Sequence, residues 1–216
     1  MEPPPQNKLK KPTYYYETSD LVIIALFASL GGVFSSFIGY LGKLFGLAIG
    51  FPQGGGQIFA GLHILWFVLV FLQTDRKVGT VILCGIIKGF IELFSASHLG
   101  IIVLYVSIGE ALVFEIVYFS LSILPKALKI ESLILISAAG LAAVSNIVIR
   151  LNTFLGFALP LEIFILILGV CFISGVVFGG YLGLFLFQLF EQSRLLSWRK
   201  ETKKPDKSFS STKTSK

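Results

Sequence analysis

The run IFILILGVCFISGVV, residues 163–177, indicates the fold class of this chain. It carries no charge, and it lacks the strict alternation of apolar and polar residues that membrane β-strands show. A helix needs about 20 mostly apolar residues to cross the hydrocarbon core of a bilayer. The apolar run continues over residues 162–192, so it predicts a membrane-spanning helix.

Five more segments of this kind precede it. They are residues 21–41, 57–73, 78–96, 101–121 and 133–151. We therefore expect an all-α membrane protein, a bundle of six transmembrane helices over residues 21–192, with a polar tail at 1–20 and a basic tail at 193–216. Tight turns are expected at 74–77 and 97–100, and helix breaks at Pro125 and Pro160. The longest inner connection, Gly42–Gly56, is either a gating loop or a plain surface loop.

The composition agrees with a membrane protein. Of the 216 residues, 55% are hydrophobic and 14% are charged, whereas soluble domains run near a quarter charged. This excludes an ordinary soluble enzyme and a disordered regulator. The two cysteines lie inside apolar runs, so a disulfide scaffold is not expected either.

The basic residues predict the orientation in the membrane. Fifteen of the 18 Lys and Arg fall in the two tails and in the second and fourth connections. By the positive-inside rule, both tails are then cytoplasmic, as six spans require. The basic C-terminal tail is expected to touch anionic lipid rather than nucleic acid.

Five ionisable groups lie inside the predicted spans: Lys88, Glu92, Glu110, Glu115 and Arg150. Each charge near the bilayer centre costs about 2.5–3.5 kcal/mol, so such groups face the bundle interior and are candidates for function. Their sum of −1 favours a cationic or hydrogen-bond-donating ring compound as ligand. The structural alternative is an ion pair, since Lys88 and Glu92 are four residues apart on one helix face.

Polar and aromatic groups from four helices are expected at one level of the membrane. With both tails inside, Glu92, Asn146, Arg150, His63 and Trp66 fall in the outer half, and Lys88 and Glu110 fall near the middle. Apolar walls with a few polar groups are typical of a small-molecule pocket. The alternatives are a structural role for His63 and a packing or interfacial role for Trp66.

Small residues recur every four positions on the first predicted span. They form the rows Ala25–Ser29 and Ala28–Gly32–Ser36. Such faces allow two helices to approach closely. We expect the first span to offer a docking face to a partner.

The motifs of several chemistries are absent. The two His and two Cys make no zinc cluster, no nucleophile elbow occurs, and no phosphate-binding or dinucleotide-binding fingerprint occurs. We expect no metal, no cofactor and no enzymatic activity. A protein of this kind that drives uphill transport takes its energy from a partner or an ion gradient.

Parts of the middle of the chain resemble a known family. The residues are WFV at 66–68, DRKVG at 75–79, FIEL at 90–93, LG at 99–100 and GEALVFE at 109–115. They are similar to the YkoE-like S components of energy-coupling factor (ECF) vitamin transporters. Glu92 and Glu115 match glutamates of the family pattern. Glu110 stands where a Gln is expected, and Lys88 where a small residue is usual.

The resemblance implies a function. An S component captures its vitamin from outside and docks, through small residues of its first span, on a coupling membrane subunit driven by two ABC ATPases. It then releases the ligand inside. Here the ligand is expected to be thiamine-like or hydroxymethylpyrimidine-like, and Gly42–Gly56 is expected to be the external lid. Pocket residues are expected to be Trp66, Glu92, Glu110 and His63, then Lys88, Asn146 and Arg150; docking residues are expected to be Ala25 and Ser29 or Ala28 and Gly32.

Two other functional classes are weighed against this one. A stand-alone secondary transporter or channel would use the intramembrane Lys and Glu groups as an ion relay and would need no ATPase. A membrane enzyme would need a nucleophile motif that the sequence lacks. A transporter subunit is therefore the function that we expect.

Overall fold

The computed structural model describes residues 16–48, 55–95, 100–123, 131–154 and 160–192, and within these ranges every regular element is a helix. In chain order the elements are α1 (Thr18–Ala48), the 3-10 helix η1 (Gly55–Phe59), α2 (Ala60–Gln73), α3 (Thr80–Phe94), α4 (Ile102–Ser122), α5 (Glu131–Phe154), α6 (Leu161–Ser174), the π-helix η3 (Gly175–Tyr181) and α7 (Leu182–Gln192).

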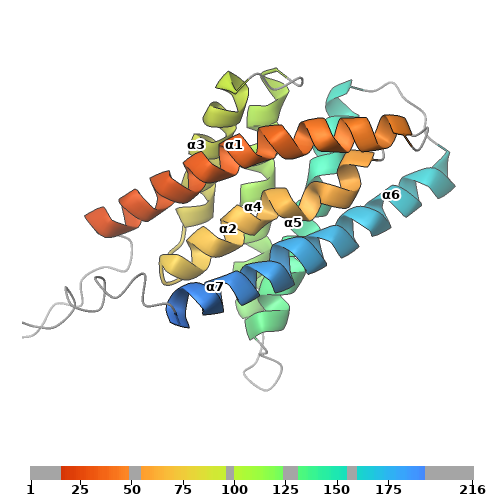
Figure 1. Cartoon of the computed structure of the whole chain (residues 1–216). Coiled ribbons are helices and arrows are strands. Elements are labelled where there is room, and N and C mark those ends of the chain that lie inside the picture. Colours follow the sequence, from red (N-terminus) through yellow and green to blue (C-terminus); the bar gives the residue numbers. More distant parts are fainter. Residues whose placement is uncertain (1–15, 49–54, 96–99, 124–130, 155–159, 193–216) are drawn as a thin grey trace, which may run out of the picture.

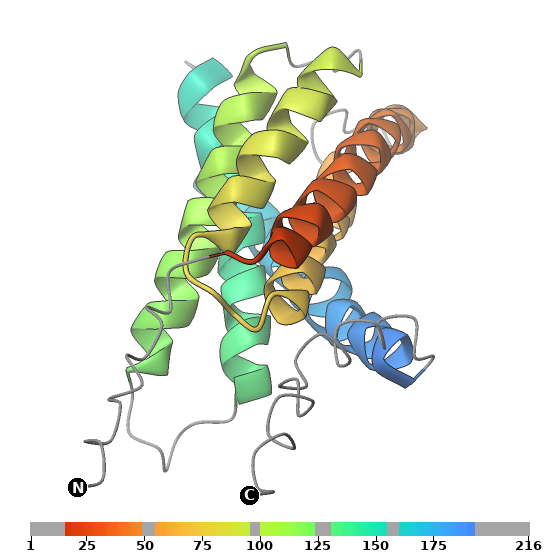
Figure 2. The ribbon, with the colours of Figure 1, turned by 90° about the vertical axis from the view of Figure 1, so that its left-hand side faces the viewer.

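The helices form two groups that cross each other. Figure 1 shows α1, α2 and the continuous run of α6, η3 and α7 lying diagonally, while α3, α4 and α5 stand more steeply. After a 90° turn, Figure 2 shows α3, α4 and α5 side by side, with α1 to their right. The start of α1, the α2–α3 turn and the end of α7 lie together, and we call this the turn end of the bundle.

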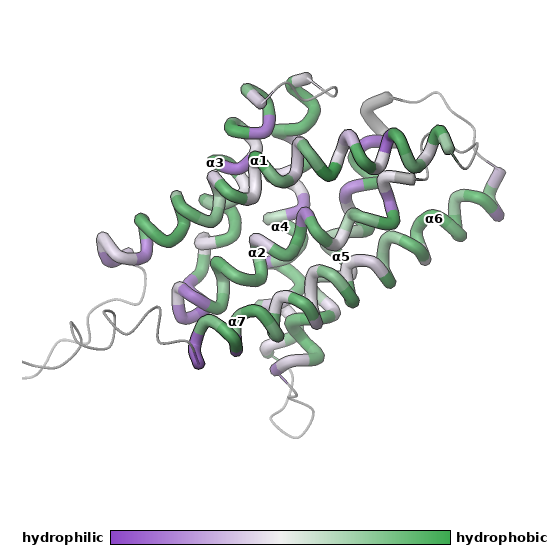
Figure 3. Tube along the Cα trace, in the orientation of Figure 1, coloured by the Kyte–Doolittle hydropathy of each residue, from purple (hydrophilic) through white to green (hydrophobic). Residues whose placement is uncertain are grey.

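Apolar surface dominates every helix. In Figure 3 hydrophilic colour gathers mainly at helix ends and at a few positions within the bundle. Within the described residues, five helical segments are long and apolar enough to cross a membrane: Thr18–Ala48, Gly56–Gln73, Ile102–Ser122, Glu131–Arg150 and Leu161–Gln192. The protein is therefore a multi-pass helical membrane protein.

Helix α3 differs from the other predicted spans. The sequence predicts a span over 78–96, but α3 has 15 residues and is shorter than the length that a bilayer normally requires. A helix is present where one was predicted. That it crosses the whole membrane, as the sixth span, stays a prediction.

The expected loop at Gly42–Gly56 is wrong in its bounds. Helix α1 continues to Ala48, and η1 begins at Gly55, so only residues 49–54 of that connection lie outside the described part. Gly42 and Gly46 are buried positions inside α1, while the apolar Leu44 and Leu47 are exposed. Glycine thus marks a packing face here, not the end of the helix. The external lid stays a prediction, and residues 49–54 of it lie outside the described part.

Helix α2 lies at the centre of the bundle. Twelve of its 14 residues are buried. Its first turn packs directly on the sixth predicted span, where the backbone N–H of Gly61 donates to Ser174 Oγ over 2.9 Å and Ser174 Oγ donates to the carbonyl of Ile58 over 2.6 Å. These bonds and the lack of a side chain at Gly61 let the two helices touch.

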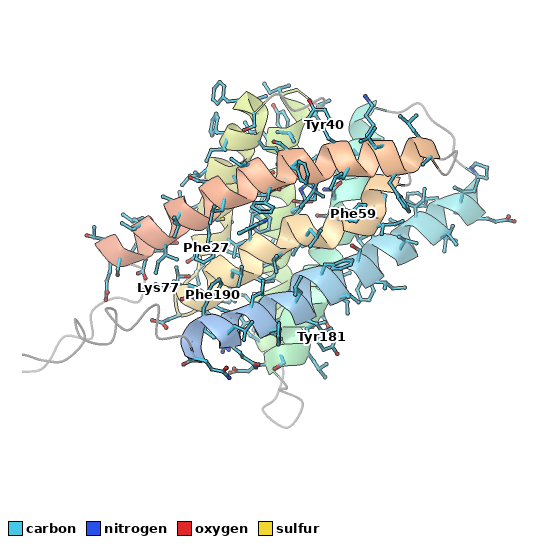
Figure 4. The ribbon with its side chains drawn as sticks, viewed as in Figure 1. Phe27, Tyr40, Phe59, Lys77, Tyr181 and Phe190 are labelled. Atoms are coloured by element: carbon cyan, nitrogen blue, oxygen red, sulfur yellow. The ribbon has the colours of Figure 1, made fainter. Side chains whose placement is uncertain are left out.

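Aromatic side chains fill the core near the turn end. Phe71 of α2 lies edge-on to Phe114 and Tyr118 of α4, with ring centroids 5.5 and 4.6 Å apart. Figure 4 shows Phe27, Lys77 and Phe190 close together at this end, and the rings of Phe27 and Phe190 lie 6.3 Å apart. Edge-to-face contacts of this kind are favourable packing arrangements for aromatic rings.

The α2–α3 turn is held by contacts with two other helices. Asp75 and Arg76 adopt positive φ angles of 55° and 59°, as a tight turn requires. Arg76 bonds Glu131 at the start of α5 over 2.6 Å, and Lys77 pairs with the buried Asp20 of α1. The charged turn that the sequence predicts at 74–77 is therefore confirmed, and it ties α1 and α5 to the turn end.

Candidate functional site

Glu115 serves a structural role at the turn end. Its carboxylate accepts the backbone N–H groups of Gly79 and Val81 over 2.8 and 2.7 Å, and that of Ile82 over 3.3 Å. These N–H groups at the start of α3 have no acceptor within the helix, and the helix dipole there favours a negative charge. The buried charge of Glu115 is thereby satisfied without a ligand.

Glu115→Gln is expected to lower the free energy of unfolding by about 2 kcal/mol, because a neutral amide accepts fewer and weaker bonds from these N–H groups. Urea or SDS unfolding of the purified protein in detergent measures the change. Glu162→Gln is the matched control, since Glu162 is exposed in the first turn of α6. Equal stability of the two variants contradicts the capping role.

Lys88 and Glu92 form a buried ion pair on α3. Their Nζ and Oε2 atoms lie 3.2 Å apart, and both residues are at most 5% exposed. Lys88 also contacts Ser107 Oγ of α4 over 3.3 Å and lies 5.5 Å from the ring centroid of Phe67 on α2. The predicted face shared by Lys88 and Glu92 is confirmed, and it points into the bundle.

Close approach of α3 and α4 makes this contact possible. A Cβ at Gly85 would lie 2.6 Å from Ala111 Cβ and 2.9 Å from the carbonyl oxygen of Ser107. Only a residue without a side chain fits there. The glycine therefore brings Ser107 within reach of the Lys88 ammonium.

A second buried pair lies on α4 and α5. The side-chain amide of Asn146 donates to Oε1 of Glu110, and both residues are at most 3% exposed. The charges of Lys88, Glu92 and Arg150 all act on Glu110. His63 of α2 is buried as well and experiences the charges of Lys88 and Arg150.

Two direct contacts, Lys88–Glu92 and Asn146–Glu110, and the electrostatic interactions of Arg150 and His63 bring six of the predicted site residues together from four helices. We call them the charge cluster: His63 of α2, Lys88 and Glu92 of α3, Glu110 of α4, and Asn146 and Arg150 of α5. Glu92 is the twelfth residue after the start of α3, roughly 18 Å along the helix from the turn end. The charge cluster thus lies in the half of the bundle away from Glu115 and the α2–α3 turn.

Trp66 lies on a different face of α2. Its indole packs on α1, where it leaves no space for a Cβ at Gly31, and its ring lies 5.4 Å from that of Phe34 and 6.5 Å from that of Phe27. Its Nε1 is buried and finds no partner in the described part of the chain. The contacts therefore join Trp66 to α1 and not to the charge cluster, and its role in a pocket stays a prediction.

The predicted docking residues fall on two faces of α1. Ala25 and Ser29 are exposed. Ala28 and Gly32 are buried, and Gly32 packs against Ile91 and the backbone of Lys88 on α3. Only the row of Ala25 and Ser29 is open to a partner, and docking itself stays a prediction.

Ser107 contacts the charge cluster, although it was not predicted from the sequence. Ser107 is 1% exposed and contacts Lys88, yet it was not among the predicted residues. The available signal was a hydroxyl inside an apolar span, three residues before Glu110 and therefore on the same side of the helix.

Comparison with known proteins gives the family. Residues 19–144, more than half of the chain, match the family described as the permease component of the ABC-type cobalt transport system. The chain belongs to this family. No curated protein sequence matches this permease component significantly.

The fold of this permease component is also known from a solved structure. The crystal structure of an S-component of ECF transporter superposes with a TM-score of 0.75 at 18% sequence identity, over 88% of this chain and 94% of the other. The all-α membrane fold that the sequence predicts is confirmed at this level.

The family description names cobalt. The described residues of this permease component include no group of three or more His, Cys, Asp and Glu placed to hold a metal ion. Its acidic groups Glu92 and Glu110 are instead accompanied by Lys88 and Arg150.

Proposed function

We propose that this protein is the substrate-capture subunit, or S component, of an ECF-type ABC importer. The observation that carries the proposal is the charge cluster, in which two cations and two carboxylates from three helices are sunk together in an apolar bundle. The family and the fold support a transport role. Within that role, the charge cluster is the best candidate for the ligand site.

A charged group of this kind is not needed for folding. Taking paired charges out of water often costs as much as their attraction returns, and apolar side chains of similar volume stabilise a protein equally well. Glu115, by contrast, has a complete structural partner set. We infer that the charge cluster is retained because it binds cargo.

The cluster alters the expected charge of the ligand. Without Glu115, the formal charges of Lys88, Arg150, Glu92 and Glu110 cancel, so the net negative charge that favoured a cation disappears. A hydroxymethylpyrimidine-like ring, which carries both donors and acceptors, then suits the site better than the thiamine cation. A bare divalent metal ion is repelled by Lys88 and Arg150.

The proposal includes partners and an orientation. We propose that a coupling membrane subunit, driven by two ABC ATPases, docks near Ala25 and Ser29 on α1. The turn end then faces the cytoplasm together with both tails, in agreement with the distribution of Lys and Arg. The charge cluster lies in the outer half, where a ligand arrives from outside.

Glu92→Gln is expected to weaken ligand binding at least ten-fold while the protein still folds, because the amide keeps the shape and one acceptor oxygen of Glu92 but loses its charge. Binding of hydroxymethylpyrimidine and thiamine to the purified protein, measured by isothermal titration calorimetry, tests this. Mass spectrometry of co-purified small molecules identifies other cargo. Trp66→Ala, on the face of α2 that packs on α1, is expected to have a similar effect, because we propose Trp66 as a pocket residue.

Glu162→Gln is the control, since it removes a carboxylate from an exposed position of α6. It should leave binding unchanged. Undiminished binding in Glu92→Gln, with a melting temperature like that of the wild type, overturns the assignment of the charge cluster as the ligand site.

A further inference from the structure

Arg150 is the cation of the charge cluster for which the described residues provide no hydrogen bond and no ion pair. Its Nε atom is buried and finds no hydrogen-bond acceptor among the described residues. The ion pairs found in that part of the chain are Arg76–Glu131, Lys77–Asp20 and Lys88–Glu92, so no described carboxylate pairs with Arg150. A buried guanidinium N–H without an acceptor can still donate a hydrogen bond to a ligand.

The acidic members of the cluster, in contrast, already have partners. Glu92 pairs with Lys88, and Glu110 accepts a hydrogen bond from Asn146. Glu110 and Glu92 attract Arg150 only electrostatically, without direct contact. Of these three groups, the cation Arg150 is therefore the one that is left to bind a ligand directly.

The position of Arg150 suits contact with cargo. It lies one turn after Asn146 on α5, and its charge acts on both Glu110 and His63. Its side chain is half-buried, unlike the fully buried Lys88. Arg150 thus lies at the edge of the charge cluster, where an arriving molecule can reach it.

We propose that the cargo carries an anionic oxygen group, a carboxylate or a phosphate, and that Arg150 binds this group. The inference rests on the proposed function and adds the chemical class of the ligand. Arginine presents its N–H donors in a planar fork that matches the two oxygens of such a group. The anion supplies the direct partner that Arg150 does not have among the described residues, while the uncharged part of the cargo contacts the rest of the cluster.

Two matched pairs of ring compounds test the inference by calorimetry on the full-length protein in detergent. Hydroxymethylpyrimidine and its phosphate ester test the phosphate, and nicotinamide and nicotinate test the carboxylate. We expect the anionic member of at least one pair to bind at least ten-fold more tightly than its uncharged partner. Arg150→Gln should remove this preference, and Arg150→Lys should keep part of it.

Lys43→Gln controls for the loss of a positive charge, because Lys43 is exposed on α1. It should leave the preference intact. The melting temperature of each variant shows whether it folds. If Arg150→Gln does not fold, Arg150→Lys still tests the inference.

The inference is overturned if the uncharged members bind as tightly as the anions, if the preference survives in Arg150→Gln, or if no member of either pair binds. Binding of uncharged hydroxymethylpyrimidine that depends on Glu92 would retain the proposed function and end this inference alone. Failure of every compound, together with failure of the protein to associate with a coupling subunit and ATPases, would end both.

Discussion

Gly61→Ala is expected to lower the free energy of unfolding by at least about 3 kcal/mol and to abolish ligand binding. A Cβ at Gly61 would lie 1.9 Å from the backbone oxygen of Ser174 and 2.5 Å from its carbonyl carbon. No side-chain rotation relieves a clash with backbone, so α2 must move away from the sixth predicted span. Overpacking of well-packed interiors costs typically 1–3 kcal/mol, and this contact is closer than most.

The effect on binding follows from the position of Gly61 on α2. Its N–H bond to Ser174 fixes the first turn of the helix, and His63 of the charge cluster lies two residues further on. SDS unfolding in detergent measures the stability, and calorimetry with the ligand measures the binding. Gly169→Ala is the matched control, because a Cβ at Gly169 on α6 meets nothing within 4 Å. Equal stability of the two alanine variants contradicts the close contact between these helices.

Lys88→Met is expected to lower the free energy of unfolding by about 3–5 kcal/mol, because it leaves the charge of Glu92 buried without its ion-pair partner. The double variant Lys88→Met/Glu92→Met should recover most of this loss, since two apolar side chains replace the pair. Both variants should fail to bind ligand. SDS unfolding and calorimetry on the two variants measure these effects.

The double variant separates a structural pair from a binding site. If the ion pair serves only folding, a stable double variant keeps its affinity for the ligand. If the pair binds cargo, as we propose, the double variant is stable but does not bind. Retained affinity in the stable double variant contradicts the proposal.

Much of the fold follows from local sequence patterns. Apolar length predicts the α-helices of the described part, the charged segment at 74–77 makes a turn, and Pro160 precedes the first residue of α6. The end of α1 could not be predicted in the same way. Gly42 and Gly46 look like helix breakers in the sequence, but only the packing of α1 on its neighbours shows that they lie within the helix.

The residues of the candidate site could be predicted from the sequence better than their arrangement in space. An ionisable residue in an apolar span points inward for energetic reasons, so Lys88, Glu92 and Glu110 could be found from the sequence. The same rule cannot tell a ligand-binding carboxylate from a helix cap, and Glu115 became recognisable only through its contacts with the first turn of α3. For Trp66, the sequence gives the helix but not the face against which the indole packs.

Ligand uptake into proteoliposomes tests the central claim most directly. The purified protein is reconstituted alone, and in parallel with a coupling subunit and two ABC ATPases, and the entry of a radiolabelled ligand is followed with and without ATP. We predict uptake only in the complete assembly with ATP, and only when Glu92 is present. Uptake by the protein alone, driven by an ion gradient, would contradict the account and would instead identify a secondary transporter.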